Sequence, residues 1–515
     1  MTGLLLAALP LALLQSRSPA LDDPAPVRYH VAPDFAGRKW RVTATVPHPE
    51  AGELEFWMPR WTAGAYHLAE YGRFVKSFEA RDAAGAALPV TRDGESRFLV
   101  AAGASDPVVL EWSAQACAQD DTNDGMILDV EGNRLAQEYG FLSPNSLLGF
   151  VKGELDRPCE VALDLPQGWQ VATALPRRDD GLFVAPSWWR LEDSPLLFSP
   201  ELRRVTFDVA GISHEVAVFG RSEEAARMIA DHCRRIVEST RDWMQGLPYP
   251  RYAFLIGFVP ESAGGSGLEH SESTLILVSP GPEMARELDH VIAHEYFHAW
   301  CAERIHVEAL DRPDYTRPIE TGTIWVNEGI TEYFSHHVLV RAGLETQEQF
   351  FDALWRSAGM ARHMWSMAGD RSWTDVSRAA SKWEGMGDLI AFSIKHYQGG
   401  CWAVLGLDLA MRRASSGERG VADLLRHLDR TCARRGQGFR EDAMAAICEG
   451  VAQGDLHDYF ERYVDGPELP DLKELLGVVG YTTKGGLAKV VPLAKPTAEQ
   501  RAALEDFFSL PRARE

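Results

Sequence analysis

The chain has 515 residues, which is enough for several domains and a large hydrophobic core. Its formal net charge is −22 at pH 7, and no block of Lys and Arg interrupts the acidic composition. We therefore exclude nucleic acid and anionic membrane surfaces as expected partners.

The first residues predict an export signal. Residues 3–14 form an apolar run that is too short to span a bilayer, and Ser18-Pro19-Ala20 precedes a polar, Pro-rich stretch. This order is typical of a secretory signal peptide over residues 1–20, cleaved near Ala20. It predicts a secreted or periplasmic protein. No later stretch is long and apolar enough to predict a transmembrane helix.

Residues 21–220 predict an antiparallel β domain. Short alternating or apolar runs recur there between Gly, Pro, Asp and Asn, as in Lys39–Val46, Val108–Trp112 and Val205–Val209. Alternation with a period of two is the pattern of half-buried strands.

The hydrophobic period changes at Ser222, where a second domain, residues 221–345, is expected to begin. Ser222 is a plausible N-cap for a helix whose apolar stripe includes Ile229 and Ile236. Two strands, Ala253–Val259 and Thr274–Val278, are predicted around a Gly-rich turn at Ala263–Gly267.

The next predicted helix carries the sequence His-Glu-Tyr-Phe-His at residues 294–298. Positions i and i+4 share one helix face, so His294 and His298 can offer their imidazoles to one Zn²⁺, while Glu295 faces the same cavity. Apolar neighbours on several sides indicate a buried helix. The alternative is a hydrogen-bonded pair of core histidines, because a buried imidazole needs a partner.

A second helical stretch supports the metal site. Asn327-Glu328-Gly329 lies inside it, with Glu328 thirty residues after His298. Glu328 is the predicted third ligand, and three protein ligands leave a position open, as in catalytic zinc sites. Glu295 would then take the proton of a zinc-activated water. Glu332 shares the face of Glu328, and we expect it to accept the other N–H of a ligand histidine.

Residues 346–483 predict a helical domain. Helical periodicity covers Gln347–Met360, Leu389–Arg413, Val421–Arg430 and Leu456–Val464. Residues 484–515 mix Lys, Pro and Ala and end in a short charged helix, which we interpret as a C-terminal appendage.

The chain has seven scattered cysteines and no CxxC pair. They predict core thiols and neither a disulfide framework nor a second metal site. Because the number is odd, at least one thiol stays free in a monomer.

Several separated blocks carry a resemblance to a known family. They are Met58–Tyr66, Gly267–His270, His294–Trp300, Trp325–Thr331 and His396–Gly400. In this order the set resembles the glycyl aminopeptidase family, zinc metallopeptidases related to the leukotriene-hydrolase and alanyl-aminopeptidase branch of the gluzincins. The resemblance covers about Val27 to Tyr481.

The resemblance implies an α+β fold with an N-terminal antiparallel β domain, a thermolysin-like zinc catalytic domain and a C-terminal helical domain. It also implies that Glu269, beside Gly267, holds the free α-amino group of the substrate, and that Tyr397 hydrogen-bonds the developing oxyanion. Such a carboxylate would select chain ends, and such a phenol would act only in the transition state. Without the resemblance, Glu269 is read as a solvated carboxylate and Tyr397 as a packing residue.

We therefore predict a zinc aminopeptidase that removes Gly or Ala from peptides with a free N-terminus. The chain departs from the family at Ala63, Cys301 and Gly399, none of which is a ligand or the base. The tail after Tyr481 is too short for the PDZ domain that the family often carries. Two alternatives are a zinc endopeptidase, which would not need Glu269, and an inactive zinc-binding peptide scaffold, which would not need the base.

Overall fold

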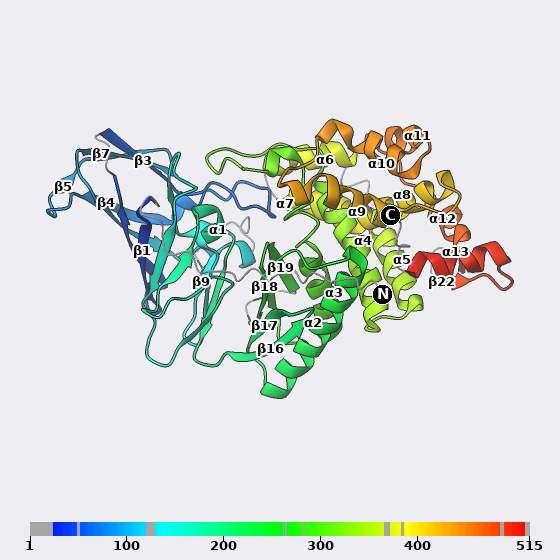
Figure 1. The fold of residues 1–515 in the computed structure, drawn as a ribbon, viewed down its shortest axis with the longest axis horizontal. Coiled ribbons are helices and arrows are strands. Elements are labelled where there is room, and N and C mark those ends of the chain that lie inside the picture. The colour runs from blue at the N-terminus through cyan, green and yellow to red at the C-terminus, as the bar shows by residue number, and fades with distance from the viewer. Residues whose placement is uncertain are drawn as a thin grey trace, which may run out of the picture.

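The structure is a computed structural model that describes residues 24–48, 52–119, 129–260, 262, 265–281, 284–364, 371–382, 386–484 and 489–509. A β-rich N-terminal region, a central sheet with its helices and a helical C-terminal region follow one another along the longest axis (Figure 1). This is the expected α+β fold. The expected signal peptide, residues 1–20, lies outside the described residues.

Three sheets build the N-terminal region. The largest has the order β14-β12-β1-β2-β8-β4-β5. Its strands are β1 (Val27–Asp34), β2 (Lys39–Val46), β4 (Val75–Arg81), β5 (Ala87–Leu88), β8 (Val108–Gln115), β12 (Cys159–Leu163) and β14 (Phe183–Ala185). The neighbouring strands pair antiparallel except for β1 and β12, which are parallel. On β2 the side chains alternate between exposed or half-buried and buried, as its sequence predicts.

The two other sheets of this region have four strands each. One contains β3 (Gly52–Trp57), β6 (Val90–Asp93), β7 (Arg97–Gly103) and β11 (Phe150–Val151). The other contains β9 (Asn133–Leu135), β10 (Gly140–Leu142), β13 (Gln170–Ala172) and β15 (Leu196–Ser199), and the short helix α1 (Trp188–Glu192) precedes β15.

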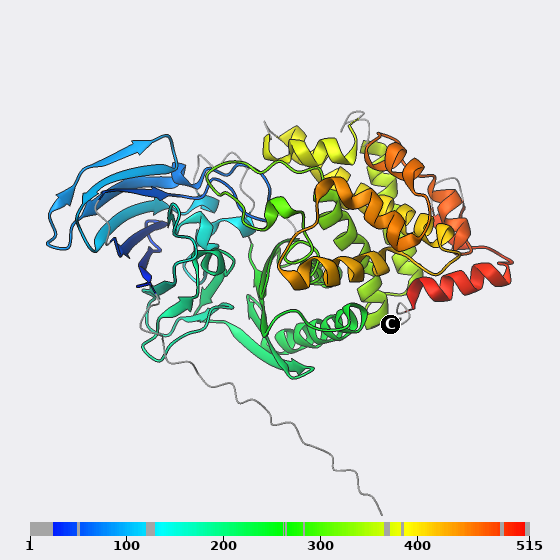
Figure 2. The ribbon, with the colours of Figure 1, turned by 45° about the horizontal axis from the view of Figure 1, so that its top comes forward.

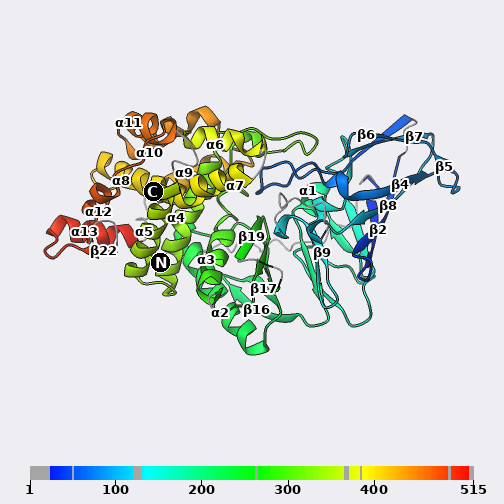
Figure 3. The ribbon, with the colours of Figure 1, turned by 180° about the vertical axis from the view of Figure 1, so that it is seen from behind.

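The central sheet has the strand order β16-β17-β18-β20-β19. Its strands are β16 (Arg203–Val209), β17 (Ile212–Phe219), β18 (Arg251–Phe258), β19 (Gly265–His270) and β20 (Ser273–Val278). Phe254 and Ile256 pack against helices on one face, whereas Ala253 and Leu255 pack against the N-terminal region on the other. Figure 3 shows α1 and β9 facing β18 and β19. Burial on both faces explains why β18 and β20 are apolar without alternation, whereas the edge strand β16 alternates between half-buried and exposed residues.

The prediction of a Gly-rich turn at Ala263–Gly267 is wrong for its last residues. Residues 265–270 form β19, an edge strand that pairs antiparallel with β20, with Gly267 opposite Ile276. Leu268 is buried between the sheet and the N-terminal region, so tertiary packing outweighs the turn propensity of the glycines. As a result, Gly267 and Glu269 lie on a fixed strand.

Three long helices lie on one side of the central sheet; the first two contact its strands, and the third packs against the first two. They are α2 (Glu223–Met244), α3 (Met284–Phe297) and α4 (Ile324–Ala342). Helix α2 begins as predicted, because the Ser222 hydroxyl accepts the Ala225 N–H at 3.2 Å. Helix α4 is buried from Ile324 to Leu339, because it lies inside the helical half of the molecule (Figure 2).

The C-terminal region is helical. It contains α5 (Gln347–Met364), α6 (Trp373–Ala379), α7 (Met386–Ser393), α8 (Gly400–Ala414), α9 (Val421–Thr431), α10 (Met444–Ala452), α11 (His457–Tyr459), α12 (Leu472–Val478), α13 (Ala498–Phe508) and the hairpin β21 (Tyr481–Lys484) and β22 (Lys489–Pro492). The C-terminal segment, expected to be an appendage, packs on this region through the buried Phe507 and Phe508. None of the described helices is long and apolar enough to cross a membrane.

The structure is helical over the whole of Leu389–Arg413, as expected, but the helical period changes in the middle. A π-helical turn, Ile394–Gly399, separates α7 from α8. A Cβ atom on Gly400 would lie 2.8 Å from the Gly329 Cα of α4, so two glycines permit the close approach of α8 to α4. This contact brings the π-helical turn next to the metal motif on α3 and α4, and π-bulges often occur at functional sites.

Candidate active site

Three side chains converge where α3 meets α4. His294 lies on α3, His298 follows directly after its last residue, and Glu328 lies on α4. The Nε2 atoms of His294 and His298 are 3.1 Å apart, and the Glu328 Oε2 lies 3.4 and 3.5 Å from them. The structure therefore brings together the three residues that the sequence predicts as metal ligands.

The other ring nitrogen of each histidine is held by an acceptor. The His294 Nδ1 lies 2.9 Å from the Glu332 Oε2, and the His298 Nδ1 lies 2.7 Å from the Cys301 carbonyl oxygen. A carboxylate and a carbonyl only accept, so both Nδ1 atoms carry the proton and donate. Each Nε2 lone pair is then directed at the common point. The predicted contact of Glu332 with a ligand histidine is confirmed.

The arrangement fits a small cation. Zinc bonds His nitrogen and carboxylate oxygen at about 2.0–2.2 Å, which places tetrahedral donors about 3.3–3.6 Å apart. The two separations that involve Glu328, 3.4 and 3.5 Å, match that spacing, and the 3.1 Å between the two histidine nitrogens is slightly shorter. Two neutral imidazoles and a carboxylate form the donor set of zinc hydrolases. Burial would raise the pKa of Glu328, but the positive charge of the protonated histidines and their hydrogen bonds outweigh it and lower that pKa to about 2, so the carboxylate is ionised.

Glu295 lies beside these donors. Its carboxylate, that of Glu269 and the His298 imidazole have donor atoms within 4.8 Å of one another. Burial raises the pKa of Glu295 to about 7, against the opposing effect of His294 and His298. A carboxylate with this pKa exchanges protons readily near neutral pH, which suits a general base. A Cβ on Gly267 would lie 2.4 Å from the Glu295 Cγ, so only glycine leaves room for this side chain.

Glu269 is held at the same place by β19 and by a loop of the N-terminal region. Its side chain is buried, with 7% of the residue exposed. A Cβ on Gly64 would lie 2.8 Å from both Glu269 carboxylate oxygens, and Gly64 has φ of +86°. Tyr66, two residues on, accepts the Asn327 Nδ2–H at 2.9 Å. The sequence block Met58–Tyr66 thus forms one wall of the site. The sequence alone did not predict this role.

Tyr397 lies on the π-helical turn, with its ring centroid 5.6 Å from that of His294. Burial, reinforced by Glu328, Glu295 and Glu269, raises the pKa of Tyr397 well above its usual value. The phenol therefore keeps its proton and is a hydrogen-bond donor beside the metal ligands.

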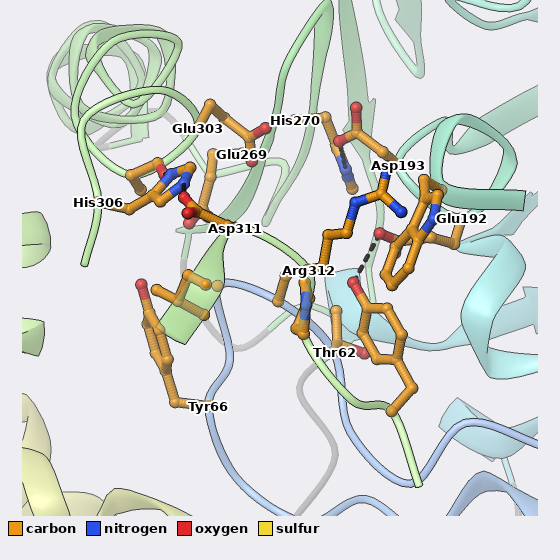
Figure 4. A pocket seen from close by; sticks show the side chains of 17 residues that line it. Thr62, Tyr66, Glu192, Asp193, Glu269, His270, Glu303, His306, Asp311 and Arg312 are labelled. Carbon is orange, nitrogen blue, oxygen red and sulfur yellow. Dashed lines mark hydrogen bonds and ion pairs between the residues drawn. The ribbon is translucent and has the colours of Figure 1, made fainter. Parts of the chain in front are cut away.

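A cavity of about 340 Å³ extends from Glu269. Figure 4 shows its walls, which come from the loop at Thr62 and Tyr66, from α1 and Asp193, from the end of β19, and from residues 302–315 after the histidine motif. His294, Glu295 and Tyr397 do not line it. The cavity therefore lies on the side of Glu269 away from these three groups.

We expect Glu332→Ala to weaken zinc binding by about 10- to 100-fold, because His294 loses the acceptor that fixes its ring. Competition with a chromogenic chelator would measure the affinity. Glu345→Ala is the matched control, because Glu345 pairs with the His336 Nδ1 at 3.1 Å and, among the described residues, makes no hydrogen bond or ion pair with a predicted ligand. An unchanged affinity in the Glu332 variant would contradict the assigned role.

The fold and the site define a metallopeptidase, because a two-histidine, one-glutamate donor set lies beside a second buried glutamate, Glu295. Comparison with known families agrees. The Peptidase M61 N-terminal domain matches residues 28–200, and the M61 glycyl aminopeptidase domain matches residues 287–400. The chain belongs to the M61 glycyl aminopeptidase family and is a peptidase. No curated protein sequence matches the chain.

Solved structures share the fold. An aminopeptidase N family protein from Idiomarina loihiensis has a TM-score of 0.78 at 24% sequence identity, over 88% of this chain and 78% of that one. An M1 zinc metallopeptidase from Deinococcus radiodurans has a TM-score of 0.52 at 15% identity, over 87% and 95%. A mutant of an M1 zinc metallopeptidase from the same organism, bound to a Tyr-Ser-Ala substrate, gives 0.50 at 16% identity, over 87% and 95%.

Proposed function

We propose that the protein is a zinc-dependent aminopeptidase that releases the first residue of peptides with a free N-terminus. One observation carries this proposal: the Glu269 carboxylate lies within 4.8 Å of the donor atoms of Glu295 and His298. An ammonium held by Glu269 would be about one residue away from the base and the ligands. The first peptide bond would therefore lie at the reacting position.

Different residues of the chain would carry out different steps of the hydrolysis. Glu269 would bind and orient the α-ammonium group through a charge-assisted hydrogen bond. Glu295 would take the proton of the attacking water and pass it to the leaving amine. The Tyr397 hydroxyl would donate to the oxyanion that develops on the carbonyl. Zinc held by His294, His298 and Glu328 would polarise that carbonyl and lower the pKa of the water.

We also propose a preference for Gly and Ala among uncharged first residues. Several carboxylates line the cavity beyond Glu269. A large apolar side chain would displace their water without offering a hydrogen bond, and the desolvation of a charge is costly. A hydrogen or a methyl group leaves the water in place.

Metal removal tests the proposed function. Dialysis against a chelator should abolish release of alanine from a short alanyl peptide, and Zn²⁺ added back in equimolar amount should restore it. The released amino acid is quantified by chromatography. Full activity after complete metal removal would refute the zinc mechanism. A zinc-loaded protein that cleaves no peptide would favour the inactive scaffold.

We further propose that the protein is secreted or periplasmic. The proposal rests on the apolar run of residues 3–14 and the Ser18-Pro19-Ala20 sequence after it. Determination of the N-terminal residue of protein recovered from the producing cells would test it, and an intact Met1 would contradict cleavage.

A further inference from the structure

The cavity beyond Glu269 is strongly acidic. Five carboxylates line it, from Glu192, Asp193, Glu269, Glu303 and Asp311. Arg312 is the only Lys or Arg in the lining, and it pairs with Asp156 at 3.0 Å through a side chain that is 70% exposed. Groups other than Arg312 must therefore balance the negative charges of these carboxylates.

Three of the five carboxylates have partners. Asp193 pairs with Arg190 at 3.1 Å and with His270 at 3.2 Å. The Asp311 Oδ1 lies 3.1 Å from the His306 Nε2. Glu192 accepts the Tyr315 hydroxyl at 2.6 Å, and burial raises the pKa of Glu192 to about 8, so it is neutral at pH 7.

Glu269 and Glu303 differ from these three. Among the described residues, neither carboxylate has a hydrogen-bond or ion-pair partner. Both side chains belong to the lining of the same cavity, where Figure 4 shows them close together. The guanidinium of Arg304, the next residue, is already bonded to the carbonyl oxygens of Ala299 and Ser271. Two carboxylates are thus directed at a space that can hold a ligand.

A single cation does not neutralise both the Glu269 and the Glu303 carboxylate. The α-ammonium bound by Glu269 would leave the half-buried carboxylate of Glu303 without a counter-charge, and desolvation of an unpaired charge is costly. A second cation, joined to the first by a short flexible chain, would satisfy Glu303. Lysine and arginine carry such a cation on the side chain of the same residue as the α-ammonium.

We propose that this cavity is a specificity pocket for a basic first residue, with Glu303 as the counter-charge of the Lys or Arg side chain. The proposal rests on the proposed aminopeptidase function and adds a substrate class to it. Glycine and alanine remain the preferred uncharged residues.

Size and lining support this occupant. The volume of about 340 Å³ exceeds that of an arginine side chain. Trp189 and Tyr315, whose ring centroids are 5.9 Å apart, offer apolar surface for an aliphatic stem or a guanidinium plane. Burial, together with the negative charges of Asp193 and Glu269, raises the pKa of Glu303 well above its usual value, so this carboxyl keeps its proton until a cation lies beside it.

The test compares arginine with citrulline, which has the same shape and no charge. Zinc-loaded protein is assayed on aminomethylcoumarin amides of arginine, citrulline and alanine. We expect kcat/KM for arginine to exceed that for citrulline by about 10- to 100-fold, the value of a charge-assisted hydrogen bond. The Glu303→Gln variant should bring this ratio close to one, whereas Glu308→Gln, which changes an exposed carboxylate outside the lining, should preserve it.

The outcomes separate the two proposals. Cleavage of the alanine amide with equal rates for arginine and citrulline in the unmutated protein would overturn the basic pocket and leave the aminopeptidase intact. A ratio that survives Glu303→Gln would overturn the role of Glu303. Calorimetric titration of zinc-loaded protein with L-arginine and L-citrulline needs no turnover: stronger binding of arginine supports the pocket even if no amide is cleaved, and equal binding refutes it.

Discussion

Replacement of Glu295 by Gln should lower turnover by about 10²- to 10⁴-fold or more, because the amide cannot accept the proton of the attacking water. The three predicted metal ligands remain, and glutamine fills nearly the same space over Gly267. Zinc content should therefore stay at the level of the unmutated protein. Steady-state kinetics on an alanyl substrate, with metal analysis of the same sample, would measure both quantities.

Glu287→Gln is a matched control on the same helix. Glu287 is exposed on α3, and its replacement changes the net charge by the same amount without touching the site. Turnover of this control should be unchanged. Full activity of the Glu295 variant would refute the proposed mechanism, and loss of zinc together with activity would show that Glu295 holds the metal site together and does not act as the base.

The parts of the site that sequence predicts are those set by helix geometry. The spacing of His294 and His298 fixes one face of α3, and the four-residue step from Glu328 to Glu332 fixes one face of α4. Only the pairing of the two helices had to be assumed. The metal donors and the contact of Glu332 with a ligand histidine could therefore be placed before the structure.

Other parts depend on tertiary contacts that have no local signal. Gly64 is 205 residues from Glu269 in sequence (269 − 64 = 205), yet a Cβ atom on Gly64 would clash with the Glu269 carboxylate. Residues 265–267 are predicted as the end of a turn because of their glycines, and only pairing with β20 makes them part of a strand. Glu303 lies in no recognisable motif, and its proposed role follows only from its place in the lining of the same cavity as Glu269. A sequence pattern cannot report such a juxtaposition.

The N-terminal region is part of the site for the same reason. Gly64 and Tyr66 close one side of it, and Tyr66 adopts φ of +61°, which is costly for a residue with a side chain. Its hydroxyl accepts from Asn327, the neighbour of the predicted ligand Glu328. The β-rich region thus fixes the closed end of the substrate site, where a chain terminus would be recognised.

That closed end should make the enzyme reject blocked N-termini. A free ammonium gains a charge-assisted hydrogen bond to Glu269. An acetylated terminus leaves the carboxylate of this residue, which is only 7% exposed, desolvated and unpaired. Alanyl and glycyl peptides should be cleaved, and their acetylated forms should be very poor substrates. We expect kcat/KM for the free peptide to exceed that for the acetylated peptide by about 10²-fold or more, because the penalty is a few kcal/mol.

The Glu269→Ala variant tests the contact between the Glu269 carboxylate and the substrate ammonium by removing the carboxylate. It should lower kcat/KM on free termini far more than on acetylated ones, because only the free ammonium loses its partner. The ratio between the two substrates should narrow, while zinc content stays constant, since Glu269 is not one of the three predicted ligands. Glu272→Ala is a suitable control, because Glu272 lies just beyond β19 and pairs with Arg190 at 2.6 Å without lining the cavity. Equal cleavage of free and acetylated peptides by the unmutated protein would instead identify an endopeptidase, for which the carboxylate of Glu269 has no substrate ammonium to bind.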